Sequence, residues 1–454
     1  MDFLNRILSE ERNNNYPLHE YINPQFAKVL KIIGFDKCYD KAEGIYLYDT
    51  DNNKYWDFLG GYGVFNIGRN HPFLKEVLKN YIDQDSASLV QMEAPLASGI
   101  LAKKLLELVP KQDLDIVYFT NSGTESIETA IKFAHGATGR QKLLFLDHAF
   151  HGLTNGSLSI NGNKEFRLGF DPLIPGCESI LLNDTKTLEE KLSTKEFAAF
   201  IFEPIQGKGV YIPDPLFLRK AEELCKKTDT LFIVDEIQTG FGRCGKMFCF
   251  EHYGITPDMI LVSKALSGGF VPIGAVLTRR SIYDKVFSSL DRCVVHSSTF
   301  GQNNFACIGG LATLEVLRKE ELIPKAHNMG EYFSTKLNTL KEKYEFVKEI
   351  RGKGLMIGIE FGSPQKLTLK MGWNLINKIN EGLFAQVISM SLMRKYKILT
   401  QVSGHKVNII KVLPPLVLSK SDIDYFVDSL DALLQESEKF PGPIWEMGKS
   451  FLKV

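Results

Sequence analysis

Short apolar runs alternate with amphipathic stretches through the middle of the chain, from about residue 100 to about residue 320. The apolar runs are rich in β-branched and aromatic residues, as expected of strands that are buried on both faces. They occupy residues 115–120, 142–147, 198–204, 231–236, 259–264 and 272–278. Helical patterns, such as residues 125–137 and 215–227, lie between several of them. This alternation predicts an α/β domain with a mostly parallel sheet.

The two ends of the chain have a different pattern. Residues 44–56 predict a hairpin around Asp51-Asn52-Asn53, after a short amphipathic start. Near the other end, a helical stretch at 326–344 precedes strand-like runs at 355–361 and 408–413 and a final helix at 421–436. We therefore predict a large domain at residues 66–325. The N-terminal segment 1–65 and the C-terminal segment 326–454 are expected to join into a smaller α+β domain.

Composition narrows the class of protein. The 454 residues include 54 basic and 54 acidic side chains, and this balance argues against a nucleic-acid partner. No apolar run approaches the roughly 20 residues that span a bilayer, and the start lacks the order of a signal peptide, so we expect a cytoplasmic protein without a membrane partner. The seven cysteines form no CxxC pattern or Cys/His cluster, which supports neither a disulfide framework nor a metal site.

Ligands of parallel α/β sheets bind at the carboxyl ends of the strands, so the residues that follow the apolar runs are the candidates for chemistry. Ser122, Gly123, Thr124 and Glu125 follow the first run and begin a predicted helix. Ser122 and Glu125 fit a capping box. The same helix start also suits a phosphate group, because free backbone N–H groups and the positive end of the helix dipole face the strand end. Both interpretations stay open on these residues alone.

Three further strand ends carry ionisable or aromatic residues. Asp235 is either a solvated strand end or a carboxylate that holds a protonated ring nitrogen or a metal. Lys264 is either a surface charge or a buried amine, which would be nucleophilic. Phe150 and His151 either pack or offer a flat face to a planar cofactor. Together these strand ends meet the requirements of pyridoxal phosphate (PLP). They offer a nucleophilic lysine, a carboxylate for the ring nitrogen, a helix start that can bind phosphate, and an aromatic ring that can stack on the cofactor.

At these residues the sequence resembles the class III aminotransferases, PLP enzymes of fold type I that include ornithine, acetylornithine, 4-aminobutyrate and putrescine aminotransferases. The resemblance covers nearly the whole chain. Its motifs include, in order, TNSGTESIETAIKFA, FHGLT, FEPIQGKGV, VDEIQTGFGRCGKMF, PDMILVSKALSGGFVPIGAV and HSSTFGQNNFA. The resemblance implies a large domain with a seven-stranded, mostly parallel sheet flanked by helices, together with the smaller domain.

The resemblance also implies roles for matching residues. Lys264 would form the Schiff base and carry the proton, and Asp235 would pair with the pyridine nitrogen. Phe150 and Ile237 would lie against opposite faces of the ring, and Gln238 near its phenolic oxygen. The remaining cofactor contacts would be Ser122, Gly123, Thr124, His151 and Glu203. Thr299 would reach the phosphate of a neighbouring subunit, which implies a homodimer with shared active sites.

Departures from the family pattern concern the substrate. Leu153 and Lys411 stand where amino-acid-specific members carry arginines, and Lys208 replaces the Glu that pairs with the second one. Lysine does not replace arginine in a bidentate carboxylate clamp without loss. We therefore expect a primary amine or aldehyde with an apolar tail rather than ornithine or acetylornithine, with Lys411 or Lys208 binding a distal carboxylate, for instance of a keto acid. Tyr62 either lines the same pocket or packs as an ordinary core residue.

The expected function is that of a PLP-dependent aminotransferase. It would move an amino group between a primary (omega-type) amine or amino acid and a keto acid or aldehyde. The alternative is a class III enzyme that uses the same cofactor for another reaction, as an aminomutase, racemase or decarboxylase, since Lys264 would serve all of these. A non-catalytic binding protein on the same fold is a third hypothesis, and the intact Lys264 and Asp235 count against it.

Overall fold

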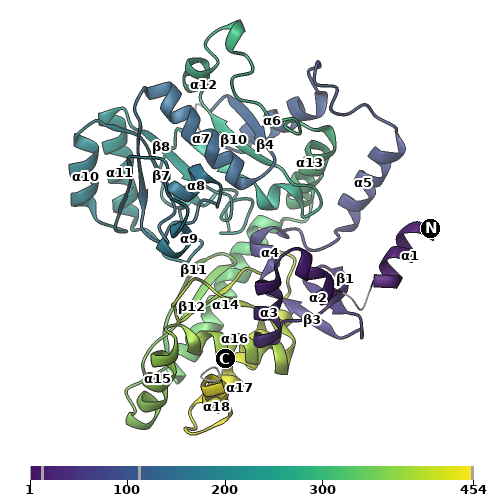
Figure 1. The fold of residues 1–454 in the computed structure, drawn as a ribbon, viewed down its shortest axis with the longest axis vertical. Helices are drawn as coiled ribbons and strands as arrows, with labels where there is room; N and C mark the ends of the chain where they lie inside the picture. Colours follow the sequence, from purple (N-terminus) through teal and green to yellow (C-terminus); the bar gives the residue numbers. More distant parts are fainter. Residues whose placement is uncertain (1, 12–14, 111–113, 451–454) are drawn as a thin grey trace.

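The computed structural model describes residues 2–11, 15–110 and 114–450. Its strands form three sheets, one of seven strands and two of four. Figure 1 shows the seven-stranded sheet and its helices in the upper part of the molecule, while segments from both ends of the chain make up the lower part. None of the helices in the described ranges is long and apolar enough to cross a membrane.

The large sheet has the strand order β4-β10-β9-β8-β7-β5-β6. Its strands are β4 (Ile116–Thr120), β5 (Lys142–Leu146), β6 (Cys177–Ile180), β7 (Phe197–Phe202), β8 (Leu231–Asp235), β9 (Met259–Val262) and β10 (Gly274–Thr278). β10 is antiparallel to both of its neighbours, and the other pairs are parallel. The predicted mostly parallel sheet is therefore confirmed. The apolar pattern did not reveal β6, because this edge strand is only partly buried and includes Glu178 and Ser179.

Helices cover both faces of this sheet, and alternate side chains along each strand join different cores. On β8, Ile233 packs in the core of α7 (Gly123–Thr138) and α12 (Arg280–Val286). Its neighbours Phe232 and Val234 belong to the core of α10 (Thr185–Ser193), α11 (Pro215–Thr228) and α13 (Asn304–Lys319). Helices α5 (Pro72–Asp83) and α6 (Leu96–Glu107) extend this second core. Burial on both faces explains the unbroken apolar runs in the sequence.

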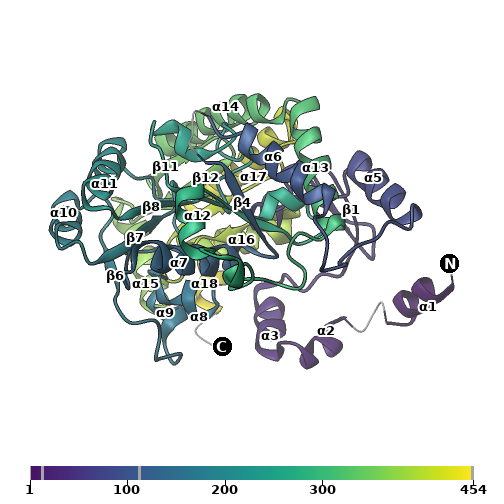
Figure 2. The ribbon, with the colours of Figure 1, turned by 90° about the horizontal axis from the view of Figure 1, so that it is seen from above.

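The N-terminal sheet includes a strand from the far end of the chain. β1 (Tyr39–Glu43), β2 (Tyr46–Asp49) and β3 (Lys54–Asp57) are antiparallel, and β2 and β3 form the predicted hairpin. β13 (Ile398–Leu399) then pairs with β3 in parallel. Helices α1 (Asp2–Glu11), α2 (Asn15–Leu18) and α3 (Pro24–Ile33) lie along the edge of the molecule in Figure 2. The pairing of β13 with β3 supports a shared smaller domain, whose boundaries stay a prediction.

The C-terminal sheet is antiparallel and has the order β11-β12-β15-β14. Its strands are β11 (Val347–Lys353), β12 (Met356–Phe361), β14 (Gln401–Val402) and β15 (Ile409–Val412). The helices of this part are α14 (Leu322–Lys343), α15 (Leu367–Ile379), α16 (Leu383–Tyr396), α17 (Lys420–Ser437) and α18 (Pro443–Ser450). We expected α17 to be the final helix, and this was wrong. α18 forms because Trp445 is fully buried and packs against Phe346 and Phe384.

Candidate active site

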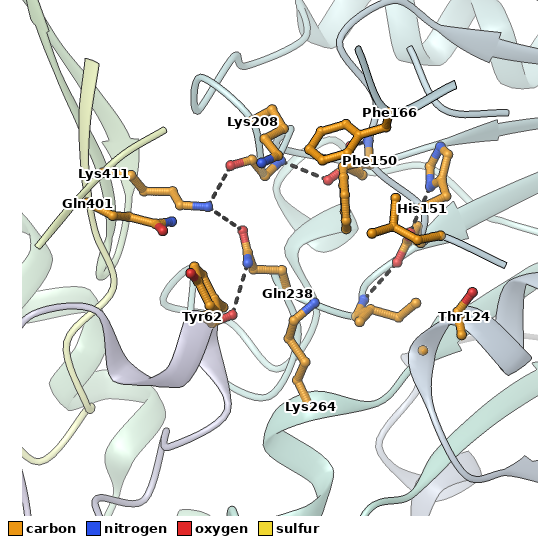
Figure 3. A pocket seen from close by; sticks show the side chains of 17 residues that line it. Tyr62, Thr124, Phe150, His151, Phe166, Lys208, Gln238, Lys264, Gln401 and Lys411 are labelled. Carbon is orange, nitrogen blue, oxygen red and sulfur yellow. Dashed lines mark hydrogen bonds and ion pairs between the residues drawn. The ribbon is translucent and has the colours of Figure 1, made fainter. Parts of the chain in front are cut away.

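The carboxyl ends of β4, β5, β7, β8 and β9 meet around a cavity of about 430 Å³. All residues that the sequence predicts for the site line it, except Ser122 and Thr299. The predicted lining residues are Tyr62, Gly123, Thr124, Phe150, His151, Leu153, Glu203, Lys208, Asp235, Ile237, Gln238, Lys264 and Lys411. In Figure 3, Lys264 rises into the cavity from one side, with Phe150 and Lys208 across from it. The fold therefore gathers residues that are up to several hundred positions apart.

Lys264 lies just beyond the end of its strand. The predicted strand included this residue, but β9 ends at Val262 and Lys264 begins a short 3-10 helix, η3 (Lys264–Ser267). Its φ of 38° is left-handed, a conformation that costs a non-glycine residue about 1–3 kcal/mol and is common at functional sites. Ser267 Oγ donates to the Lys264 carbonyl at 2.9 Å and helps to hold this turn. The strained turn thus points the amine into the cavity.

Burial makes the Lys264 amine easier to deprotonate. Desolvation lowers its pKa below the ordinary value of 10.5, and the negative charges of Asp235 and Glu203 oppose this effect only in part. An uncharged amine is the form that attacks a carbonyl carbon. The lowered pKa therefore favours the uncharged form of the Lys264 amine inside the cavity.

Asp235 is fixed in orientation by two hydrogen bonds. Its Oδ1 accepts from the Ile237 backbone N–H at 3.0 Å, and its Oδ2 accepts from His151 Nδ1 at 2.8 Å. Burial lowers the pKa of His151, but the hydrogen bond to Asp235 and the charges of Asp235 and Glu203 outweigh it and raise the pKa overall. His151 Nε2 is buried and has no hydrogen-bond partner among the described residues. The carboxylate keeps lone pairs for one more donor, such as a ring N–H.

Glu203 connects the segments that follow β5 and β7. Its Oε2 accepts from the Phe150 backbone N–H at 3.0 Å, and its Oε1 accepts from the Gly207 N–H at 2.7 Å. Desolvation raises the pKa of this fully buried carboxyl. Glu203 thereby fixes the backbone at Phe150 and the turn that carries Lys208.

The start of α7 borders the cavity at Gly123, where any larger residue would clash with Ile237. Ser122 is the N-cap and its Oγ accepts from the Glu125 N–H at 3.3 Å. The predicted capping box is only half formed, because the Glu125 carboxylate accepts from Asn121 N–H, at 2.8 Å, instead of from Ser122. A Cβ on Gly123 would stand 2.9 Å from Ile237 Cγ2. The helix start therefore keeps space and free N–H groups at the cavity.

Thr124 and Gly152 complete this part of the cavity wall. Thr124 Oγ1 lies 2.6 Å from Thr154 Oγ1 and 2.7 Å from Ser157 Oγ, both at the start of α8 (Asn155–Ser159). Gly152 has a φ of 131°, and a Cβ there would stand 2.5 Å from Thr124 Oγ1. Backbone N–H groups and hydroxyls at a helix N-terminus are suited to a phosphate group.

Four lining residues were missed from the sequence: Gly152, Phe166, Gly207 and Gln401. Gly152 and Gly207 lie inside the quoted motifs, which could have indicated them. Gln401 is opposite Lys411 in the β14–β15 pairing, a register that no sequence pattern gave. Phe166 lies on the four-residue helix α9 (Lys164–Arg167), and we find no local signal for its role.

Lys411 is held inside the cavity wall. Its Nζ donates to the Gly207 carbonyl at 2.6 Å and to Gln238 Oε1 at 3.1 Å, while Gln238 Nε2 donates to the Tyr62 carbonyl at 2.9 Å. Burial, together with the charges of Lys208 and Lys264, lowers the pKa of Lys411 to about 7. Thr299, by contrast, lies away from the cavity on an exposed segment, where its carbonyl accepts from Gln91 Nε2 at 3.0 Å.

The sequence profile of the family Aminotransferase class-III matches residues 33–434. The chain belongs to the class III aminotransferases. It is similar to the aminotransferase PigE of a Serratia species, at 34% identity over 93% of this chain, although it spans only 53% of PigE. It is 37% identical to the acetylornithine aminotransferase of Methanocaldococcus jannaschii, over 88% of this chain and 94% of that protein. The solved ornithine aminotransferase of Toxoplasma gondii superposes with a TM-score of 0.78 at 29% identity, covering 89% and 92% of the two chains.

This class III aminotransferase is a PLP-dependent enzyme of fold type I, which transfers an amino group between an amine or amino acid and a keto acid or aldehyde. The cavity fits the cofactor. It offers a buried amine, a carboxylate with free lone pairs, a helix start kept open by glycine, and an aromatic ring. The comparisons give no support to an aminomutase, racemase or decarboxylase.

Proposed function

We propose that Lys264 is the catalytic lysine of this aminotransferase and that Asp235 anchors the cofactor ring. The observation that carries this proposal is the buried Lys264 amine, with a lowered pKa, in the same cavity as the Asp235–His151 pair. PLP, when bound, supplies an aldehyde that carries the amino group and a protonated ring that accepts electrons. Lys264 Nζ would take the proton from the reacting carbon atom of the substrate and deliver it to the carbon atom of the cofactor's aldehyde group.

The other residues bind and orient. Asp235 would keep the ring nitrogen protonated, and His151 holds the Asp235 carboxylate in place. Phe150 and Ile237 would bind the two faces of the ring, Gln238 its phenolic oxygen, and the backbone of Gly123 and Thr124 its phosphate. Ser122 caps the helix that presents these N–H groups, and Glu203 fixes the Phe150 backbone. With the exception of Ser122, these residues all line one cavity, and this supports their roles.

For the substrate, we propose a primary amine paired with an aldehyde or keto acid that carries an apolar chain. No arginine is among the described residues that line the cavity, so a bidentate carboxylate clamp is missing from this part of the wall. Leu153 and Phe166 offer apolar surface, and Tyr62 lines the same space. The cations left to bind a distal carboxylate are Lys208 and Lys411.

A panel of amine donors tests this substrate proposal. Purified enzyme with PLP is assayed for amino transfer from alkyl amines, ornithine, acetylornithine and putrescine to a set of aldehydes and keto acids. We expect apolar primary amines to be used best. Efficient and selective use of ornithine or acetylornithine would refute the substrate proposal, and transfer from no donor would refute the catalytic one.

We also propose a homodimer in which Thr299 reaches the phosphate site of the neighbouring subunit. The segment that carries Thr299 exposes large apolar side chains, including Leu290, Val294 and Phe300, and Met92 and Leu96 are exposed on the segment that contacts it. Exposed large apolar side chains on two segments that contact each other are typical of interaction sites. A cytoplasmic location is proposed as well, since the seven cysteines, none of them in a disulfide, suit a reducing compartment.

A further inference from the structure

The two lysines of the substrate side of the cavity, Lys208 and Lys411, have different partners. Lys411 is 4% exposed, and its Nζ donates two hydrogen bonds inside the protein, to the Gly207 carbonyl and to Gln238 Oε1. Through Gln238 it is connected to the Tyr62 backbone. Lys411 therefore links β15 to the turns after β7 and β8 and, through Gln238, to the N-terminal segment. At least two of its N–H groups are thus bound by the protein itself.

Lys208 has no such partners. Within the described residues, no carboxylate lies within 4.0 Å of its Nζ and no hydrogen bond is formed by it. Its Nζ lies 5.2 Å from the centre of the Phe150 ring and 5.0 Å from that of Phe166. The faces of these rings attract a cation but accept no ordinary hydrogen bond. The half-buried ammonium of Lys208 therefore keeps its N–H donors free at the cavity wall.

The acidic residues around Lys208 do not neutralise it by contact. Glu203 and Glu165 act on it only at longer range, and burial lowers its pKa in spite of them. The Glu203 carboxylate is already bound by two backbone N–H groups, of Phe150 and Gly207. A buried or half-buried cation without a counter-ion is costly, and an anionic ligand would remove that cost.

Lys208 also lies between two cavities. It lines the cofactor cavity and a second cavity of about 370 Å³, whose other lining residues include His148, Asn163, Tyr211 and Gly404. Figure 3 places Lys208 beside Phe150 and Phe166, across from Lys264. A substrate that reacts at Lys264 and extends past these rings would bring its far end to Lys208.

We propose that Lys208 binds a carboxylate of the substrate that is separated from the reacting carbonyl by an apolar chain, whereas Lys411 is a positioning residue that holds Gln238. This inference rests on the proposed function, and it selects one of the two lysines as the specificity determinant. The substrate class is accordingly an aldehyde or ketone whose remote carboxylate follows an unsubstituted alkyl chain, unlike ornithine and acetylornithine, which carry a nitrogen atom next to the carboxylate. The apolar surfaces of Phe166 and Leu153 would contact the chain between the two groups.

The test compares adipic semialdehyde with hexanal, which has the same chain length but no carboxylate, as acceptors for the holoenzyme with one amine donor. We expect Lys208→Met to lower kcat/KM for adipic semialdehyde about 10- to 100-fold more than for hexanal, mainly through KM, since hydrogen bonds to charged groups are among the strong ones. Lys208→Arg, which keeps the charge, should retain the preference. Lys411→Met should lower kcat for both acceptors alike and shift the absorbance of the bound cofactor.

Two controls separate this inference from the proposed function. Lys186→Met, an exposed lysine on α10, should change neither acceptor's kinetics. Hexanoate, which cannot react, should bind the wild-type holoenzyme more tightly than hexanol does, and Lys208→Met should remove that difference in an absorbance titration. The inference is overturned if Lys208→Met keeps the preference for carboxylates or if Lys411→Met alone removes it. If the wild type binds hexanoate but transfers an amino group to none of the acceptors, the proposed function is contradicted instead.

Discussion

Replacing Lys411 with methionine should change how the stability of the enzyme depends on pH. The pKa of Lys411 falls from 10.5 to about 7 in the folded protein, because the amine is buried near Lys208 and Lys264. In the unfolded chain the same amine stays protonated up to about pH 10.5. Between these values the unfolded chain binds more protons, so the stability of the wild type rises with pH. Methionine does not titrate, so in Lys411→Met this position contributes nothing to the pH dependence of stability.

The magnitude follows from the size of the pKa shift. Each pH unit within the window is worth about 1.4 kcal/mol, so the free energy of unfolding of the wild type minus that of Lys411→Met should rise by about 2 kcal/mol from pH 7.5 to pH 9.0. An unfolding entropy of about 2.1 cal/mol/K per residue over 454 residues converts this into a change of about 2 °C in the Tm difference.

Thermal unfolding of the two holoenzymes at both pH values measures this gap. Lys411→Arg provides the matched control, because arginine stays charged throughout and its gap to Lys411→Met should not change with pH. A Tm difference between wild type and Lys411→Met that is equal at pH 7.5 and pH 9.0 would show that Lys411 keeps an ordinary pKa. The proposal that Lys411 holds Gln238 through an amine that is largely uncharged above pH 7.5 would then be wrong.

Three further predictions concern the cofactor cavity and the dimer. Lys264→Ala should lower turnover at least about 10³-fold, because it removes the nucleophile and the proton carrier, while equilibrium dialysis still detects PLP binding; near-normal turnover would contradict the assignment. Gly152→Ala should weaken PLP affinity in absorbance titrations, because its Cβ would stand 2.5 Å from Thr124 Oγ1, whereas Gly99→Ala, with open space around it, should not. A random 1:1 mixture of Lys264→Ala and Thr299→Glu subunits should recover about a quarter of wild-type activity if Thr299 acts across the interface, because about half of the dimers are mixed and each mixed dimer has one intact site; it should recover none if Thr299 acts within its own subunit.

The large sheet could be predicted because its strands are buried on both faces. Apart from the half-buried Leu231, the residues of β7 to β10 are all buried, and such apolar runs are visible without any tertiary information. β11, with the sequence VKEIRGK, and the two-residue strands β13 and β14 have no comparable pattern. Their pairing depends on contacts with distant segments, such as β3 with β13.

The site could be predicted in part for the same reason. Asp235 is the last residue of β8 and Lys264 lies just beyond β9, and parallel strands bring such positions to one edge of the sheet. The side-chain contacts that distinguish Lys208 from Lys411 were not predictable, since they depend on how β15 packs against the turns of the large sheet. The role of Phe166 is likewise set by its contact with Phe150 and Lys208 in space.

Chemical trapping of the cofactor tests the central assignment most directly, because the described part of the cavity wall holds three lysines, Lys208, Lys264 and Lys411. The holoenzyme is reduced with borohydride and digested, and the peptides that carry the pyridoxyl group are identified by mass spectrometry. We predict that the label is on Lys264 alone. A label on Lys208 or Lys411, or no labelled peptide at all, would contradict the account.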